Sequence, residues 1–418
     1  MALSERSDHS GVDSLRKLPA VNAEKIEWVT SDIDPFSKEH FDDPWGNLAE
    51  LRDLAPAVWL TKHGCWAVAG HADVTSAFRE YETFCSGAGV GLSDFRKEPP
   101  WRPPSIILEA DPPDHTKARK VLADVLSPAN VKSMKEMFDR VADEMIGALI
   151  NTGTFDGVTA LAEAYPLKVF PDAVGVTQHD RHHLLAYGNM VFNSFGPRNE
   201  FFEQGMVNAA ETRTWIMAQC ARSALTRDGL GAQIYEASDR GEVTEDEAGL
   251  LLRSFLSAGV DTTISAFTAA LWALATYPEQ WDSLRNDPTL ARAAFEEAIR
   301  FEGPIQTFFR TTTGATALGG VDMRAGEKVV LLLAGANRDA RRFPDPNRFD
   351  ITRRTVGHVG YGFGIHVCVG QVVARLEGEA LLGALARQAR TISLAGEPVR
   401  RYNNTLRTFA SLPLALTS

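Results

Sequence analysis

The chain has 418 residues, of which 44% are hydrophobic, and its 43 Lys and Arg against 54 Asp and Glu give a formal net charge of −11. This charge disfavours nucleic acid and anionic membranes as main partners. Four cysteines without paired metal-ligand spacing indicate reduced thiols. The polar N-terminus contains no apolar run of signal-peptide or membrane-anchor length, so we expect a cytoplasmic protein without a membrane partner.

The chain begins with a stretch that lacks periodicity, residues 1–33, which we predict to be a disordered tail. Residues 34–418 show no linker, repeat or low-complexity segment and are predicted to form one domain. Its first elements are a helix near residues 44–54 and a small hairpin made from residues 58–60 and 65–69.

Residues 86–114 are rich in glycine and proline, with apolar side chains interleaved among them. A loop of this length inside a globular chain is usually functional or disordered. Its apolar residues favour an ordered loop that packs on the domain, and we interpret it as a lid loop.

The next part of the chain is mostly helical to about residue 225, with interruptions near 151–153 and 195–197. A capping box then predicts an apolar helix over residues 246–277. A further helix, residues 288–301, is expected to end at Gly303-Pro304. Short apolar runs such as 328–333 predict strands, so the expected fold class is mainly α with small sheets.

The segment 361–371 places one cysteine in a glycine-rich turn before a helical pattern that spans about residues 372–389. Gly362 and Gly364 permit backbone angles closed to other residues and a close approach to a flat ligand. Cys368 would lie at the start of a helix, where the dipole favours a thiolate. A thiolate in a dry pocket needs a cation, and a haem iron fits. A lone cysteine, in contrast, is usually just a buried free thiol.

This segment resembles the haem-binding signature of the cytochrome P450 family, with Tyr361 in a position where the family usually has phenylalanine. The resemblance extends over about residues 34–416. It implies the P450 fold, a single helical domain with small β-sheets. It also implies a heme b cofactor with Cys368 as the iron ligand, and O₂-dependent monooxygenation.

A second motif, residues 258–263, lies within the long predicted helix. A glycine inside a helix costs about 1 kcal/mol, so Gly259 requires a reason. An acid next to an alcohol can relay protons, although an exposed Asp beside an ordinary Thr is the simpler interpretation. The resemblance implies that Asp261 and Thr262 are the catalytic acid–alcohol pair and that Gly259 lies against the haem.

The resemblance also assigns the remaining cofactor contacts and a supporting network. The two haem propionates need cationic or hydrogen-bonding partners. The expected cofactor-binding residues besides Gly259 are His115, Arg119, Arg310, Phe363 and His366. The residues Glu297 and Arg300, three apart on a helix, suggest an exposed pair on their own. The resemblance instead implies a buried structural network that includes Arg348.

The lid loop resembles that of a bacterial branch of the family that oxidises para-substituted benzoates, including 4-methoxybenzoate. A benzoate needs donors at one end and apolar walls around its ring. Surface solvation of the arginines and ordinary core packing of the phenylalanines are the simpler alternatives. Ile305 is bulkier than the valine of this branch. The predicted carboxylate-binding residues are Arg102, Ser105, Arg253 and Ser254, and the predicted ring-binding residues are Leu108, Phe192, Phe195, Ala258, Ile305 and Phe308.

The chain has no flavin or iron–sulfur motif, and the glycines at 87–91 lack the setting of a dinucleotide fingerprint. The resemblance therefore implies a 2Fe-2S ferredoxin and an NAD(P)H-dependent ferredoxin reductase as partners. Basic residues predicted to dock the carrier are Arg338, Arg341, Arg342 and Arg353. Three alternatives stay open: another small apolar substrate such as a terpene, fatty acid or macrolide, a peroxide-driven enzyme, and a non-catalytic haem protein.

Overall fold

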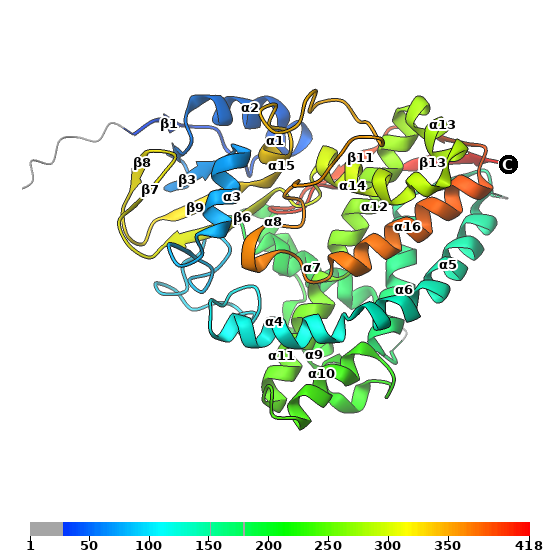
Figure 1. Ribbon diagram of the computed structural model, residues 1–418, viewed down its shortest axis with the longest axis horizontal. Helices are drawn as coiled ribbons and strands as arrows, with labels where there is room; N and C mark the ends of the chain where they lie inside the picture. Colours follow the sequence, from blue (N-terminus) through cyan, green and yellow to red (C-terminus); the bar gives the residue numbers. More distant parts are fainter. Residues whose placement is uncertain (1–27, 151, 179) are drawn as a thin grey trace, which may run out of the picture.

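The computed structural model describes residues 28–150, 152–178 and 180–418. The protein is mainly helical, with its largest sheet at one side, and this matches the fold class expected from the sequence (Figure 1). The helices are α1 (Lys38–Asp42), α2 (Trp45–Leu54), α3 (His71–Arg79), α4 (Asp114–Val125), α5 (Pro128–Ile150), the π-helix η1 (Val158–Glu163), α6 (Ala164–Val174), α7 (His182–Asn193), α8 (Glu200–Gly205), α9 (Ala209–Gln219), the 3₁₀ turn η2 (Arg222–Ala224), α10 (Leu230–Asp239), α11 (Glu245–Ala258), α12 (Asp261–Thr276), α13 (Pro278–Asn286), the 3₁₀ turn η3 (Pro288–Leu290), α14 (Ala291–Glu302), α15 (Leu333–Asn337), the 3₁₀ turn η4 (Gly364–His366) and α16 (Gln371–Gln388).

The strands form one six-stranded sheet and three smaller sheets. The large sheet has the order β1 (Thr30–Ser31), β2 (Val58–Leu60), β3 (Cys65–Val68), β9 (Lys328–Leu332), β6 (Thr307–Thr312) and β4 (Phe84–Cys85). The smaller sheets contain β10 (Thr391–Leu394), β13 (Pro413–Thr417) and β5 (Thr154–Asp156), then β11 (Val399–Arg401) with β12 (Thr408–Ser411), and β7 (Thr316–Leu318) with β8 (Val321–Met323).

The N-terminal part of the large sheet confirms the predicted hairpin and shortens the predicted tail. Strands β2 and β3 pair antiparallel, with Val58 opposite Ala67. Strand β1 pairs in parallel with β2, so regular structure begins before residue 34, where we expected it to begin. The reason is aromatic packing, because the Trp28 ring lies 5.1 Å from both the Trp59 and the Trp66 rings. Residues 1–27 of the predicted tail lie outside the described residues.

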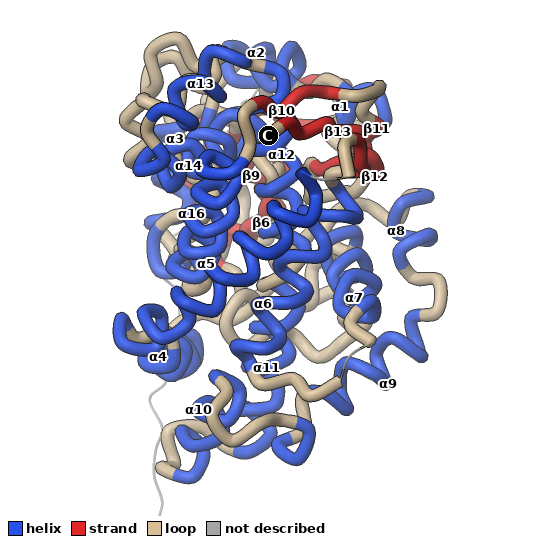
Figure 2. Tube along the Cα trace, turned by 90° about the vertical axis from the view of Figure 1, so that its right-hand side faces the viewer, coloured by secondary structure: helices blue, strands red, loops and turns tan. Residues whose placement is uncertain are grey.

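The helical side is built around α12, whose side chains are almost all buried. Helix α12 packs on α14, α14 packs on α16, and α16 packs on α5, as the two perpendicular views show (Figures 1 and 2). The stretch Glu245–Thr276 is long and apolar enough to cross a membrane by length and composition, but 72% of its most apolar window is buried inside the fold. This burial is what a core helix requires.

The single helix predicted over residues 246–277 is wrong in one respect, because it is interrupted. The capping box of Thr244 and Glu247 starts α11 as expected. Helix α11 then ends at Ala258, and α12 starts at Asp261. At Gly259, a Cβ atom would lie 2.3 Å from the Phe170 ring of α6, so only glycine lets these helices approach so closely.

Two further predictions, the helix over residues 288–301 and the lid loop, agree with the structure in their bounds and differ from it in detail. The predicted helix 288–301 is a 3₁₀ turn, η3, followed by α14, which ends at Gly303 with a φ of +56° as the Gly-Pro stop predicts. The lid loop has no helix or strand between β4 and α4 within its described residues. It is nevertheless packed, since Arg102, Ser105 and Glu109 are all buried.

Candidate haem-thiolate site

The loop that carries Cys368 is fixed by two glycines with left-handed backbone angles. Gly362 has a φ of +72° and Gly364 a φ of +69°, which favour glycine strongly. A Cβ atom at Gly364 would lie 2.6 Å from the carbonyl oxygen of Phe78. The Cys368 N–H donates to the Tyr361 carbonyl at 2.8 Å, which closes the loop directly before α16. The glycine pattern seen in the sequence therefore has a steric cause.

The thiol of Cys368 faces a large internal cavity, enclosed by protein on its other sides. Its pKa is raised, because burial outweighs the N–H groups of Gly370 and Gln371 and the positive charge of Arg119 and Arg375. The N–H groups at the start of the helix favour a thiolate as expected, but burial has the larger effect. A bound cation is therefore needed to hold the sulfur as a thiolate, as the sequence indicates.

Tyr361, the departure from the usual signature, has a specific partner. Its hydroxyl donates to Glu296 Oε1 at 3.2 Å, and the Arg375 guanidinium lies 4.5 Å from its ring centroid. Glu296 also contacts His358 at 3.0 Å. The hydroxyl is thus accommodated by a polar cluster below the loop, while the ring still lines the cavity next to Cys368.

The cavity extends from the Cys368 loop to α11 and the lid loop. Its wall is mainly apolar, with a few polar groups near its two ends. Among the predicted residues it is lined by Arg102, Ser105, Leu108, His115, Arg119, Phe192, Phe195, Arg253, Ser254, Ala258, Gly259, Thr262, Ile305, Phe308, Arg310, His366 and Cys368.

Four of these residues form a group of donors on the side of α4. The His115 and His366 rings lie 4.3 Å apart, and the Nε2 atom of each is buried without a hydrogen-bond partner among the described residues. Arg310 is 2% exposed, and burial lowers its pKa to about 10. Arg119 donates to the Val367 carbonyl. Buried donors of this kind require an anion, and two carboxylates of a haem fit them.

Two predicted cofactor contacts are placed differently. Phe363 does not line the cavity, and its ring instead packs under the Arg79 guanidinium at 5.4 Å. Gly259 does line the cavity, but the space that its missing Cβ leaves is filled by Phe170. The position thus needs glycine for helix packing against α6, whereas we expected the reason to be a flat ligand.

Asp261 and Thr262 lie at the break between α11 and α12 and point to different surroundings. Thr262 lines the cavity, and its hydroxyl donates to the Ala258 carbonyl at 2.8 Å. Asp261 lies behind it, 6% exposed, with Oδ2 packed against Gly188 of α7 and without a hydrogen-bond partner in the described structure. Burial raises the Asp261 pKa to about 7. This carboxyl therefore can hold and release a proton near neutral pH.

Glu377 is a cavity residue that the sequence analysis missed. It lies on α16, nine positions after Cys368, and is 1% exposed. Burial raises its pKa well above the usual range, although a hydrogen bond with the Thr263 side chain opposes this shift. The sequence around Glu377 shows only the regular pattern of a packed helix, and this pattern does not indicate that a buried carboxyl lines the cavity.

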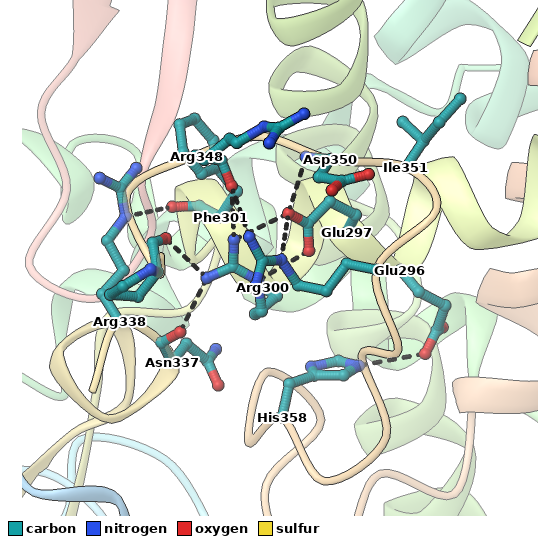
Figure 3. A network of polar contacts seen from close by, with 12 residues as sticks. Glu296, Glu297, Arg300, Phe301, Asn337, Arg338, Arg348, Asp350, Ile351 and His358 are labelled. Carbon is teal, nitrogen blue, oxygen red and sulfur yellow. Dashed lines mark hydrogen bonds and ion pairs between the residues drawn. The ribbon is translucent and has the colours of Figure 1, made fainter. Parts of the chain in front are cut away.

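The predicted structural pair is buried, as the resemblance implies (Figure 3). Arg300 makes two hydrogen bonds to Glu297, at 2.7 and 2.8 Å, and both side chains are 0% exposed. Arg300 also donates to the carbonyls of Asn337 at 3.0 Å and Pro346 at 2.9 Å. Every guanidinium nitrogen of Arg300 thus has a partner.

The predicted role of the Arg348 side chain in this network is wrong. Arg348 is exposed, and it contributes only its main-chain carbonyl, which accepts from Arg300 at 3.3 Å (Figure 3). The second cation beside Glu297 is Arg353, whose Nε lies 3.1 Å from Glu297 Oε1. The resemblance implied Arg348, but the side chain that reaches Glu297 is that of Arg353.

The same network removes part of the predicted docking surface. Arg338 is 7% exposed and lies over the Trp45 ring, and Arg353 is held by Glu297. Arg341 and Arg342 are exposed, although Arg341 pairs with Asp339 at 2.8 Å. Only two of the four predicted arginines are therefore placed to meet another protein.

The far end of the cavity brings the lid loop onto α11. Ser105 Oγ and Ser254 Oγ are 2.9 Å apart. The Arg253 guanidinium donates to the carbonyls of Pro103 at 2.8 Å and Pro104 at 3.2 Å. All four predicted carboxylate-binding residues line the cavity here.

Arg102 is not a free donor, contrary to our expectation for the lid loop. Its two terminal nitrogens donate to Glu109 at 2.9 and 3.2 Å, and both side chains are buried. Glu109 also accepts the Ser105 N–H at 2.6 Å. Glu109 could not be identified from the sequence, because six intervening residues of irregular loop hide the pairing.

Between the two ends the cavity has aromatic walls. The Phe195 ring lies 5.9 Å from both the Phe192 and the Phe308 rings. Leu108, Ala258 and Ile305 complete the apolar lining. Ile305 is held by a bridge to Leu406, so its backbone position is fixed by the C-terminal part of the chain.

No group of three or more His, Cys, Asp or Glu in the described chain is placed to hold a metal ion. One cavity-facing cysteine, two buried histidines with unpartnered Nε2 atoms and an apolar chamber together fit a haem-thiolate site.

Comparison with known proteins agrees with this class. A family profile described as cytochrome P450 matches residues 199–405. The chain is 52% identical over 386 residues to the protein named cytochrome p450 CYP199A2 from Rhodopseudomonas palustris, covering 92% of this chain and 94% of the relative. It is 32% identical to cytochrome P450 107B1 from Saccharopolyspora erythraea, covering 77% and 80% of the two chains. The solved structure of cytochrome P450 CREJ in complex with (4-ethylphenyl) dihydrogen phosphate is similar with a TM-score of 0.83 and 26% identity, covering 92% and 99%.

The chain belongs to the cytochrome P450 family and is a P450 monooxygenase close to CYP199A2. Membership of the family implies a haem-thiolate cofactor and external redox partners.

Proposed function

We propose that this P450 oxidises para-substituted benzoic acids, with O-demethylation of 4-methoxybenzoate to 4-hydroxybenzoate as the leading reaction. The observation that carries the proposal is the polar end of the cavity, where Ser105 and Ser254 meet between two buried guanidinium groups. A neutral substrate such as a terpene would leave the Arg253 charge without a counterion, since Arg102 is already paired with Glu109.

The polar end lies at a suitable separation from the Cys368 end. Ser254 and Thr262 are eight residues apart along α11 and the start of α12. At 1.5 Å per helical residue this is about 12 Å, close to the length of a small aromatic acid. A carboxylate held by the Ser105 and Ser254 hydroxyls and the Arg253 charge would point the para substituent toward Thr262.

The aromatic walls would hold the ring and so select the position that reacts. Phe192, Phe195 and Phe308 surround the middle of the cavity, and Ile305 narrows it. Because orientation is fixed at both ends, only the para group can reach the reacting position. Ile305 is expected to disfavour bulky para groups.

A haem b group would be held by Cys368 at the iron and by His115, Arg119, Arg310 and His366 at the propionates. When bound, it supplies activation of O₂. One oxygen atom enters the methoxy carbon, and the resulting hemiacetal collapses to phenol and formaldehyde. The other oxygen atom leaves as water, using two protons and two electrons. We propose a 2Fe-2S ferredoxin and its NAD(P)H-dependent reductase, in the cytoplasm, as the electron source.

Asp261 and Thr262 would deliver the protons. Thr262 presents a hydroxyl to the cavity, and Asp261 behind it has a pKa of about 7. A group with this pKa can take a proton from the outside and pass it inward at neutral pH. The positive charge of Arg401 lowers the Asp261 pKa and the negative charge of Glu163 raises it, but burial has the larger effect.

The test is a titration of the ferric haem protein with 4-methoxybenzoate, followed through the Soret band. We expect a saturable shift toward high-spin iron, which Ser254→Ala weakens by about tenfold through loss of one hydrogen bond to a charged group. Turnover with a ferredoxin and reductase should give 4-hydroxybenzoate and formaldehyde in equal amounts.

The matched comparison is 4-methoxybenzamide, which has the same shape without the charge. Ser257→Ala on the same helix serves as a control, because this serine also lines the cavity but its hydroxyl donates to the Ser254 carbonyl. Equal affinity for the acid and the amide would contradict the proposal.

A further inference from the structure

The polar end of the cavity contains an unequal number of buried charges. Arg102 and Arg253 are 8% and 3% exposed, and Glu109 is 5% exposed. Glu109 is engaged with Arg102, whereas Arg253 has only carbonyl partners among the described residues. Two cations and one anion leave one uncompensated positive charge.

The other titratable groups near Arg253 do not alter this balance. Tyr187 on α7 and Cys220 at the end of α9 are buried, and burial raises the pKa of each, so both are neutral at physiological pH. Arg213 is exposed on α9, where solvent screens it. The surplus at this end is therefore set by Arg102, Arg253 and Glu109.

Because the site is buried, the uncompensated positive charge affects which ligands can bind. An unpaired charge in a dry site is costly, and one anion of unit charge would neutralise it. A second negative charge on the ligand would instead have no compensating cation, because Glu109 already neutralises Arg102. A neutral ligand would leave the Arg253 charge unmatched.

We propose that Glu109 is a specificity-determining residue that sets the charge of this pocket, so that it accepts monoanionic carboxylates and rejects dianions. This inference rests on the proposed carboxylate-binding function. Glu109 would act in two ways: it orients Arg102 and the Ser105 N–H, and it cancels one of the two guanidinium charges. Only the second action depends on the charge of the ligand.

The experiment separates the two actions with ligands that share the 4-methoxyphenyl ring and differ in the charge of the polar group. Calorimetric titration of the haem-loaded enzyme uses 4-methoxybenzamide, 4-methoxybenzoate and 4-methoxyphenylphosphonate, in mildly alkaline buffer where they carry zero, one and two negative charges. The proteins are the wild type, Glu109→Gln, Glu109→Asp and Glu98→Gln. Glu98 is the matched lid control, since its side chain is 39% exposed and pairs with Arg198 at the surface.

In the wild type we expect the benzoate to bind most tightly of the three. Glu109→Gln should improve affinity, relative to the amide, by about tenfold for each negative charge on the ligand, as expected for removal of one nearby charge in a partly buried site. The Glu109→Gln variant should therefore bind the phosphonate more tightly than the benzoate. Glu109→Asp should keep the wild-type charge dependence, and Glu98→Gln should leave all three affinities unchanged.

Two outcomes overturn the inference and can be told apart. If Glu109→Gln changes all three affinities by the same factor, Glu109 only positions its neighbours, and the benzoate function stands. If the wild type does not prefer the benzoate to the amide, the proposed function and the inference fall together.

Discussion

Buried charged groups are treated in opposite ways on the two sides of the Cys368 loop. In the network of Figure 3, Glu297 and Arg300 are fully buried and fully partnered. In and beside the cavity, buried polar atoms lack partners in the described structure, namely Arg102 Nε, His115 Nε2, Asp261 Oδ2, His366 Nε2 and Glu377 Oε1. The satisfied Glu297–Arg300 pair rigidifies the support, although Asn337 Nδ2 next to it has no partner in the described structure. The unsatisfied groups at the cavity lie where ligands and protons can be handled.

The largest expected effect comes from removing one partner of the buried Glu297–Arg300 pair. Glu297→Gln should destabilise the folded protein by about 3–5 kcal/mol, because it leaves the Arg300 charge buried without a full counterion. Denaturant unfolding measures this. The control is Glu144→Gln, whose partner Arg140 is at the surface, and its effect should be within about 0.5 kcal/mol. Similar losses for the two variants would contradict the contrast.

The next effect concerns Asp261 and the dependence of stability on pH. Its folded pKa of about 7 lies above the 3.8 that is usual for an aspartate, so the unfolded chain loses this proton first as pH rises. Stability should therefore fall between about pH 4 and pH 7 and stay level above, by up to roughly 4 kcal/mol for this group. Asp261→Asn should remove this contribution. Parallel pH profiles for variant and wild type would show that Asp261 does not titrate in this range.

The third prediction concerns the cavity side and the activity of variants at Asp261 and Thr262. Asp261→Asn or Thr262→Ala should lower product formation by about 100-fold, in the range that acid–base groups contribute. The ligand-induced Soret shift should persist, because neither side chain belongs to the carboxylate end. Activity with peroxide in place of O₂ and reductase should be reduced less. Unchanged turnover with the redox partners would contradict proton delivery by Asp261 and Thr262.

The smallest expected effect concerns Tyr361, whose ring lines the cavity while its hydroxyl belongs to the polar cluster around Glu296. Tyr361→Phe removes one hydrogen bond to Glu296, which keeps Arg375 and His358 as partners. The loss should be about 1 kcal/mol in unfolding, with turnover close to wild type. A large loss of turnover would mean that the tyrosine hydroxyl acts on the cavity side.

Much of the site could be predicted because it lies in short motifs. The Cys368 loop, the Asp261–Thr262 pair and the Gly303 helix stop are local patterns whose geometry follows from glycine, capping and spacing. The Glu297–Arg300 pair was identifiable as a pair, but only the resemblance to a family indicated its burial. The mainly helical fold class followed from periodicity and stop signals.

Contacts between distant or irregular segments could not be predicted. Glu109 pairs with Arg102 across six loop residues, and Arg353 replaces Arg348 beside Glu297, because turn geometry decides which side chain points inward. Gly259 was expected beside a flat ligand and is instead required by Phe170.

The sequence by itself thus determined the iron-ligand loop, the order of elements and the candidate residues, since local backbone preferences encode these. Only the tertiary structure decided which charges are paired and which are left over. Burial turns a surface pair into a buried network, and raises the pKa of Asp261 and Glu377, because the cost of a charge depends on every segment that excludes water from it.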